Sequence, residues 1–300
     1  MHILRKSVLF CASTAFAISL AAAPDTAAPR AKLSAAEIVE KNVAARGGLR
    51  AWRAVETLSL AGKMGAGGNQ RATLAVPIPD ANGDKRQLQF AKRPAEEAQL
   101  PFLLELKRPH KQRLEVRFNG QTAIQVYDGT KGWKLRPFLN RNDVEPFTTE
   151  ELNIASMQTE LDGPLVDYAA KGTQVELAGV EKVEGRDTYE LKLTLKTGRA
   201  IHVWIDAETF LETKMEGTPR RLDGTDHPVE VYFRDFRPVG GVRIPYILET
   251  KVLPVARNAL GLRDTPVPVE RITIEKVEVN PKLADALFAK PVMTIASNNK

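Results

Sequence analysis

The stretch "PFLLELKRPHKQRLEVRF", residues 101–118, determines what kind of structure this chain can form. Apolar residues alternate with other residues, many of them charged, in two runs of this stretch. The apolar side chains that would share one side of the two strands are Phe102, Leu104, Leu106, Leu114, Val116 and Phe118. Successive side chains of a strand point to opposite faces, so the pattern predicts antiparallel strands with one apolar face.

The same alternation continues on both sides of this stretch. Leu191, Leu193 and Val203 are the apolar positions of a later meander, and Asp128-Gly129 is placed to form the turn of a hairpin. About a dozen such strands are expected. A sheet of that size must curl and cover its apolar face.

Two helical segments are available as covers, at residues 34–55 and 148–170. Each begins with a capping box, formed by Ser34 with Glu37 and by Thr148 with Glu151. In the second segment Gly163-Pro164 separates a longer helix from a short predicted helix, Leu165–Ala170. The apolar residues of this segment that would face the sheet are Ile154, Met157, Leu161, Leu165 and Tyr168.

These patterns predict an α+β, mainly β protein. Its strongly curved antiparallel sheet would form an incomplete β-barrel, with helices covering the concave apolar face. The two β halves could belong to two domains, but one continuous sheet within a single domain, residues 33–300, is the simpler interpretation.

The first residues have the layout of a secretory signal peptide, with a basic start, an apolar run and small residues. We expect a signal peptide at 1–21 and a flexible mature N-terminus at 22–32. The only cysteine, Cys11, lies inside the leader and lacks the sequence of a lipoprotein anchor. The expected product is a periplasmic protein without lipid anchor, cysteine chemistry or disulfides.

The charges are scattered along the chain. The formal net charge is +6, from 43 basic and 37 acidic residues, and no dense basic block occurs. Nucleic acid is therefore not an expected partner, whereas weak attraction to anionic lipid headgroups is compatible with this composition.

The sequence holds few candidates for metal or cofactor chemistry. His110, His202 and His227 share no metal-ligand spacing, and no nucleotide or hydrolase motif is present. The segment Asp80–Asp84 begins like a calcium loop, but its glycine and closing acid are misplaced. We expect no metal, no cofactor and no enzyme activity.

Asp162 and Asp167 have two interpretations. They could be a catalytic carboxylate pair in a secreted hydrolase. Alternatively, Asp162 caps the short helix that follows, Asp167 faces water, and Leu161, Leu165 and Tyr168 are the functional residues of a lid.

Several segments together resemble the outer-membrane lipoprotein-sorting protein family, the LolA/LolB-like proteins of the bacterial periplasm. They include "AAEIVEKNVAARGGLRAWRAVETLSLAGKM" (35–64), "VYDGTKGWKL" (126–135), "LDGPLVDY" (161–168), "VEGRDTYELKLTLKTG" (183–198), "VYFRDFRPVGGVRIPY" (231–246) and "IEKVEVNPKLADALFAKP" (274–291). The resemblance spans nearly the whole mature chain. The loops at 77–86 and 254–268 are longer than in a minimal carrier.

The resemblance implies a non-enzymatic protein whose concave apolar face receives acyl chains. The expected function is a periplasmic, monomeric carrier that receives acylated lipoprotein or lipid from a membrane donor and passes it to an acceptor. The alternative is an envelope sensor or scaffold of the same fold that binds a protein. Cavity and lid candidates are Phe102, Leu104, Leu106, Leu114, Val116, Phe118, Ile154, Met157, Leu161, Leu165, Tyr168, Leu191, Leu193 and Val203.

Overall fold

The computed structural model describes residues 33–67, 97–137, 141–158, 160–222, 224–256 and 267–292. From Ser34 onward the described residues belong to one compact unit. The predicted signal peptide, the mature N-terminus to residue 32 and the calcium-like segment at 80–84 lie outside the described residues.

Most of the described chain is β-strand. The strands are β1 (Thr57–Gly67), β2 (Glu97–Lys107), β3 (Lys111–Phe118), β4 (Gln121–Tyr127), β5 (Gly132–Arg136), β6 (Arg141–Pro146), β7 (Gln174–Val183), β8 (Arg186–Thr194), β9 (Ala200–Asp206), β10 (Glu212–Glu216), β11 (Arg220–Leu222), β12 (Thr225–His227), β13 (Val229–Val239), β14 (Val242–Val252) and β15 (Glu270–Val279).

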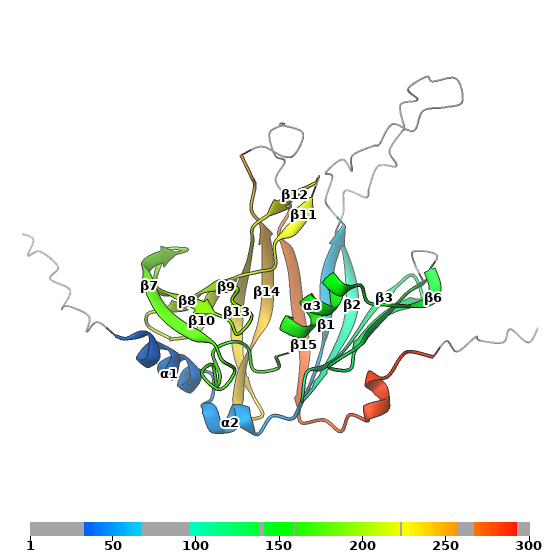
Figure 1. Ribbon diagram of the computed structural model, residues 1–300, viewed down its shortest axis with the longest axis horizontal. Coiled ribbons are helices and arrows are strands. Elements are labelled where there is room, and N and C mark those ends of the chain that lie inside the picture. Colours follow the sequence, from blue (N-terminus) through cyan, green and yellow to red (C-terminus); the bar gives the residue numbers. More distant parts are fainter. Residues whose placement is uncertain are drawn as a thin grey trace, which may run out of the picture. The chain divides into compact units, whose positions relative to one another are not determined.

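Thirteen of these strands form one antiparallel sheet in the order β6-β5-β4-β3-β2-β1-β15-β14-β13-β10-β9-β8-β7. Strands β11 and β12 pair separately as a hairpin. In the described part of the chain, β6 and β7 each pair with one neighbour only, so the sheet curves without closing (Figure 1). The predicted fold class, a curved and incompletely closed antiparallel sheet, is confirmed.

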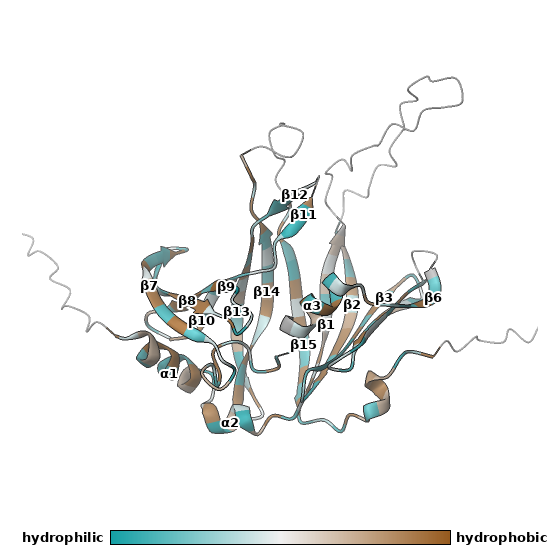
Figure 2. Cartoon of the chain, viewed as in Figure 1, coloured by the Kyte–Doolittle hydropathy of each residue, from teal (hydrophilic) through white to brown (hydrophobic). Residues whose placement is uncertain are grey.

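In the described ranges, three helices and a 3-10 turn accompany the sheet. They are α1 (Ala35–Ala45), α2 (Leu49–Arg53), α3 (Thr149–Gln158) and η2 (Asp285–Phe288). Both predicted capping boxes form: the Glu37 N–H donates to the Ser34 hydroxyl, and the Glu151 N–H donates to the Thr148 hydroxyl. Figure 2 shows hydrophobic stretches on α1 and along the strands.

The predicted helix at Leu165–Ala170 is wrong. The structure has a series of turns there, and Asp167 adopts a φ of +53°, which is not compatible with a right-handed helix. The helix that begins at Thr149 ends at Gln158, so Leu161 also lies in the irregular segment. We call residues 160–172 the cover loop.

Two glycines bring the helices close to the sheet. A Cβ on Gly47 would lie 2.3 Å from the Gly241 carbonyl oxygen, and the φ of Gly47 is +113°. A Cβ on Gly132 would lie 2.0 Å from the Phe147 ring, just before α3. Glycine at these positions lets the connection from α1 to α2, and the start of α3, pack directly on strand backbone.

Candidate functional site

The strand residues predicted to line a cavity share one face of the sheet. Directly opposed residues of antiparallel strands lie on the same face. Phe102 is opposite Val116, and Leu104 is opposite Leu114. In the other half of the sheet, Leu191 is opposite Val203. The registers through β1, β15, β14, β13 and β10 connect these positions without a change of face.

The helices are attached to this same face. Leu114 is directly opposite Gln125, and Gln125 is directly opposite Lys134, so Lys134 lies on the same face as Leu114. The Lys134 ammonium binds the Glu151 carboxylate of α3 at 2.6 Å. At the other half, Arg46 follows α1 and binds Glu212, which lies opposite Ile205. The apolar stripe therefore lies on the face that carries α1 and α3, as the sequence predicted, and we call it the covered face. The 3-10 turn η2 lies against the other face of β3, where Arg113 Nη1 donates to the Leu287 carbonyl at 3.1 Å.

Packing on the covered face is uneven. Leu191 and Leu193 are 0% exposed and Val203 is 1% exposed, so the half formed by β8 and β9 is filled. Leu104, Leu106, Leu114 and Val116 are only half-buried. Apolar side chains on β2 and β3 thus keep exposed surface on this face, as do Leu177 and Val180 at the β7 edge. Apolar surface of this kind is what an acyl chain can bury.

The remaining candidates vary in their surroundings. Phe102 and Leu161 are each 8% exposed, Leu165 is 1% exposed, and Phe118 at the strand end is 38% exposed. Ile154 and Tyr168 are half-buried. The Met157 side chain lies outside the described residues.

Asp162 is held by cations instead of capping a helix. Arg108 Nη2 donates to one carboxylate oxygen at 2.7 Å and Lys171 Nζ to the other at 2.6 Å. Arg46 Nη1 donates to the Asp162 carbonyl at 3.0 Å. The Asp162 side chain is only 4% exposed, so these contacts fasten the cover loop to β2 and to the end of α1.

Asp167 does not simply face water, as the sequence suggested. Its carboxylate accepts two hydrogen bonds from the Arg53 guanidinium of α2, at 2.9 and 2.5 Å. These bonds lower the pKa of Asp167. The two aspartates therefore bind different cations, and the lowered pKa of Asp167 is unsuited to a general acid, which requires a raised one.

Sequence reasoning missed these cationic partners. Asp162 and Arg108 are 54 positions apart, and Asp167 and Arg53 are 114 apart. The sequence singled out the two acids but not their partners. No spacing rule connects residues that are so far apart in the chain, because only the fold brings them together.

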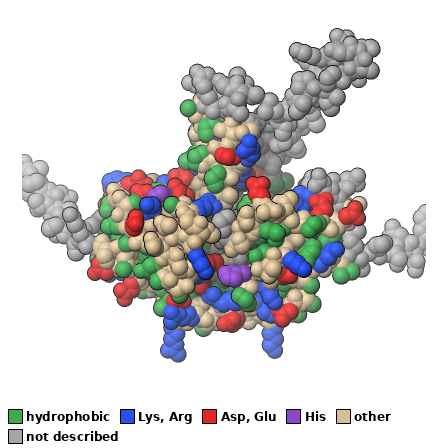
Figure 3. Space-filling model, viewed as in Figure 1, with side chains coloured by type: hydrophobic (Ala, Val, Ile, Leu, Met, Phe, Trp, Pro, Cys, Tyr) green, Lys and Arg blue, Asp and Glu red, His purple; other side chains and the backbone are tan. Residues whose placement is uncertain are grey.

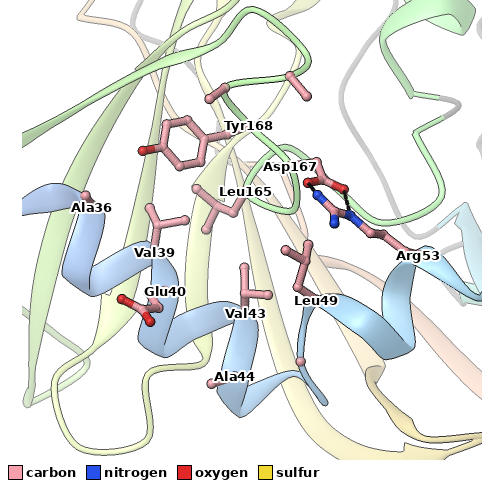
Figure 4. Close-up of a pocket in the computed structure, with 13 residues that line it drawn as sticks. Ala36, Val39, Glu40, Val43, Ala44, Leu49, Arg53, Leu165, Asp167 and Tyr168 are labelled. Carbon is pink, nitrogen blue, oxygen red and sulfur yellow. Dashed lines mark hydrogen bonds and ion pairs between the residues drawn. The ribbon is translucent and has the colours of Figure 1, made fainter.

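An apolar groove of about 630 Å³ lies between the helices and the cover loop. Figure 4 shows Val39 and Val43 of α1 facing Leu165 and Tyr168, with the Arg53–Asp167 pair beside Leu49. The volume is within the range of pockets that bind small apolar molecules. The cover loop and α1 are thus incompletely packed against each other.

The histidines form no metal site in the described part of the chain. No group of three or more His, Cys, Asp or Glu side chains that could hold a metal was found among the described residues. His202 Nδ1 lies 3.0 Å from the Glu216 carboxylate, on the face opposite to Val203, and His227 is buried near the Leu253 carbonyl. None of the helices in the described ranges is both long and apolar enough for a membrane span.

The comparisons with known proteins find similar structures but no sequence family. No protein-family model matches the chain, and no curated protein matches it either. A LolA superfamily protein from Nitrosomonas europaea is 14% identical, covers 86% of this chain and 98% of its own, and gives a TM-score of 0.48.

Two further solved structures are similar to the same degree. A DUF1329 family protein from Desulfovibrio piger is 14% identical with a TM-score of 0.47, covering 84% of this chain and 95% of its own. A putative outer membrane lipoprotein-sorting protein domain from Vibrio parahaemolyticus is 12% identical with a TM-score of 0.46, covering 85% and 96%. At these identities and TM-scores the three likenesses assign no family to this chain.

Proposed function

We propose that this chain is a periplasmic carrier that binds acyl chains of lipids or lipoproteins on the covered face of its sheet. The observation that supports the proposal is the half-buried apolar surface of Leu104, Leu106, Leu114 and Val116. On the same face Leu191, Leu193 and Val203 are buried, whereas the four side chains of β2 and β3 keep apolar surface that a cargo could cover.

Binding would be driven by removal of acyl surface from water. Each buried CH₂ group contributes about 0.8 kcal/mol, so a long chain gains several kcal/mol after the cost of ordering it. No charged partner at the apolar surface is needed for this, because the hydrophobic effect is not directional. Release requires only that the cover separates from the sheet or that an acceptor offers equal burial.

The cover loop has the construction expected of a movable cover. It lacks regular secondary structure, packs incompletely on α1, and is fastened by the ion pairs of Asp162 and Asp167. The loop also buries Leu161, Leu165 and Val166, so opening must expose these side chains. Such an opening can still leave the sheet folded, since local opening costs less than global unfolding.

The proposal is tested with a fluorescent fatty acid and two matched variants. Leu104→Glu places a charge on the covered face, whereas Leu103→Glu places it one residue away on the outer face, at a position that is also half-buried. We expect Leu104→Glu to weaken probe binding at least tenfold and Leu103→Glu to leave it within about threefold.

Equal binding by the two variants would contradict a site on the covered face. Failure of the unmodified protein to bind the probe, together with no stoichiometric lipid in an organic extract analysed by mass spectrometry, would contradict carriage of acyl chains altogether.

A further inference from the structure

One end of the sheet gathers positive charge from five separate parts of the chain. The β2–β3 and β4–β5 turns, the β13–β14 turn, α2 and the segment after β15 all meet there (Figure 1). Two hydrogen bonds connect some of these parts: the Glu56 N–H donates to the Asn280 side-chain carbonyl, and the Arg243 N–H donates to the Arg46 carbonyl. We call this the α2 end.

Four cations at the α2 end are exposed. They are Arg50 in α2, Lys131 in the β4–β5 turn, Arg243 at the start of β14 and Lys282 after β15. Among the residues that the structure describes, none of the four has an ion-pair partner. Figure 3 shows Lys and Arg side chains projecting from the corresponding edge.

The other charges at this end do not cancel the four. Arg53 pairs with Asp167, while Lys107 and Lys111 share the single carboxylate of Asp285. Glu56 and Asp128 carry two further negative charges, fewer than the four exposed cations. The balance at the α2 end is therefore positive.

An apolar side chain stands among these cations. Leu49, the first residue of α2, is 36% exposed and precedes Arg50. Leu49 and Arg53 also line the groove between α1 and the cover loop, so the charged end is continuous with an apolar surface. Exposed basic residues beside an apolar side chain are the combination that binds at the interface of an anionic bilayer.

We propose that the α2 end docks on the surface of an anionic phospholipid bilayer. Mobile lipid headgroups can adjust to cations that are scattered over four elements, whereas a rigid partner would need a matching arrangement of carboxylates. Each cation near such a surface strengthens binding about fivefold, and salt weakens the attraction. This inference goes beyond acyl binding and does not depend on which cargo the covered face takes.

The test is sedimentation with vesicles, using protein isolated from the envelope of cells that express the full chain. Vesicles of phosphatidylcholine alone are compared with equimolar phosphatidylcholine and phosphatidylglycerol, at 50 mM and 500 mM salt. The triple variant Arg50→Glu, Lys131→Glu and Lys282→Glu removes exposed cations that make no ion pair among the described residues, so its fold is expected to be kept.

The matched control is Arg117→Glu, Arg221→Glu and Arg271→Glu. These three arginines are exposed, lie toward the opposite end in β3, β11 and β15, and give the same change in net charge. Arg221 and Arg271 make long ion pairs, with Asp226 at 3.6 Å and with Glu249 at 3.9 Å, and such exposed pairs contribute little to stability. We expect the unmodified protein to bind only the anionic vesicles at low salt. The α2-end variant should bind about a hundredfold more weakly, from three fivefold factors, and the control within about threefold of the unmodified protein.

Two results would overturn docking at the α2 end. One is an equal loss in both variants, which would show that total charge and not its location matters. The other is no preference of the unmodified protein for anionic vesicles. Fatty-acid binding is measured on the same samples: if it is absent while docking persists, the proposed carrier function fails and the docking surface stands.

Discussion

Asp162 is the residue on which the cover loop depends most. Its buried carboxylate binds Arg108 and Lys171, and its carbonyl accepts from Arg46. Removing one partner of a buried ion pair is costly because the other charges remain desolvated. The cover loop is therefore fastened by a network that cannot lose its central acid without penalty.

We expect Asp162→Asn to lower the free energy of unfolding by about 2–3 kcal/mol. This loss is somewhat smaller than the loss expected on breaking a fully buried ion pair, because Arg108 is partly exposed. Asp167→Asn should cost clearly less, because Arg53 is 61% exposed and exposed pairs contribute little. Urea denaturation of the two variants measures both values. A larger loss for Asp167→Asn would mean that the wrong acid has been assigned as the fastening residue.

The pH dependence of the Asp167 contact follows from its lowered pKa. Hydrogen bonds from Arg53 lower the folded-state pKa below the ordinary 3.8. The contribution of the pair is thus fully present above the unfolded-state pKa and is lost as pH falls through the lowered native value. We expect the stability difference between the unmodified protein and Asp167→Asn to be constant from pH 5 to 7 and to shrink only below about pH 4.

Denaturation at a series of pH values measures this difference. A stability difference that already shrinks between pH 5 and 7 would contradict the sign of the shift.

At the scale of elements, α3 is positioned by a glycine in the neighbouring strand. The Phe147 ring occupies the space where a Cβ of Gly132 would lie. We expect Gly132→Ala to destabilise the protein by about 1–3 kcal/mol, because the ring and the start of α3 must shift. Gly179→Ala in β7 is the matched control, since its nearest atom would be 3.8 Å from the new Cβ.

Hydrogen exchange resolves where the effect is located. The α3 peptides should lose protection in Gly132→Ala and keep it in Gly179→Ala. Unchanged protection of α3 in the first variant would show that Phe147 does not position this helix.

The elements differ in how far local sequence determines them. The start of α1 was predictable, because Ser34 and Glu37 satisfy each other's backbone groups within one turn. The segment Leu165–Ala170 looked helical because Pro164 suits a first helical position. There the distant contacts of Asp162 and Asp167 and the positive φ of Asp167 prevail over local preference.

For the whole molecule, the sequence indicated which residues share a face but not how that face is packed. The alternation of Phe102, Leu104 and Leu106 with other residues places these three side chains on one face of their strand. Antiparallel pairing then places the directly opposed residues of the next strand on the same face. Whether Leu104 is covered like Leu191 depends on where α1 and α3 lie, and that depends on contacts between residues far apart in the chain.

The most direct test of acyl binding on the covered face is photo-crosslinking with a palmitate that carries a diazirine on its chain. After irradiation, peptide mass spectrometry locates the labelled residues. We expect label on the β2 and β3 peptides that contain Leu104, Leu106, Leu114 and Val116, and its loss when unlabelled palmitate competes. Label confined to the outer face or to the groove peptides of α1, or no label that palmitate displaces, would contradict the carrier site proposed for this sheet.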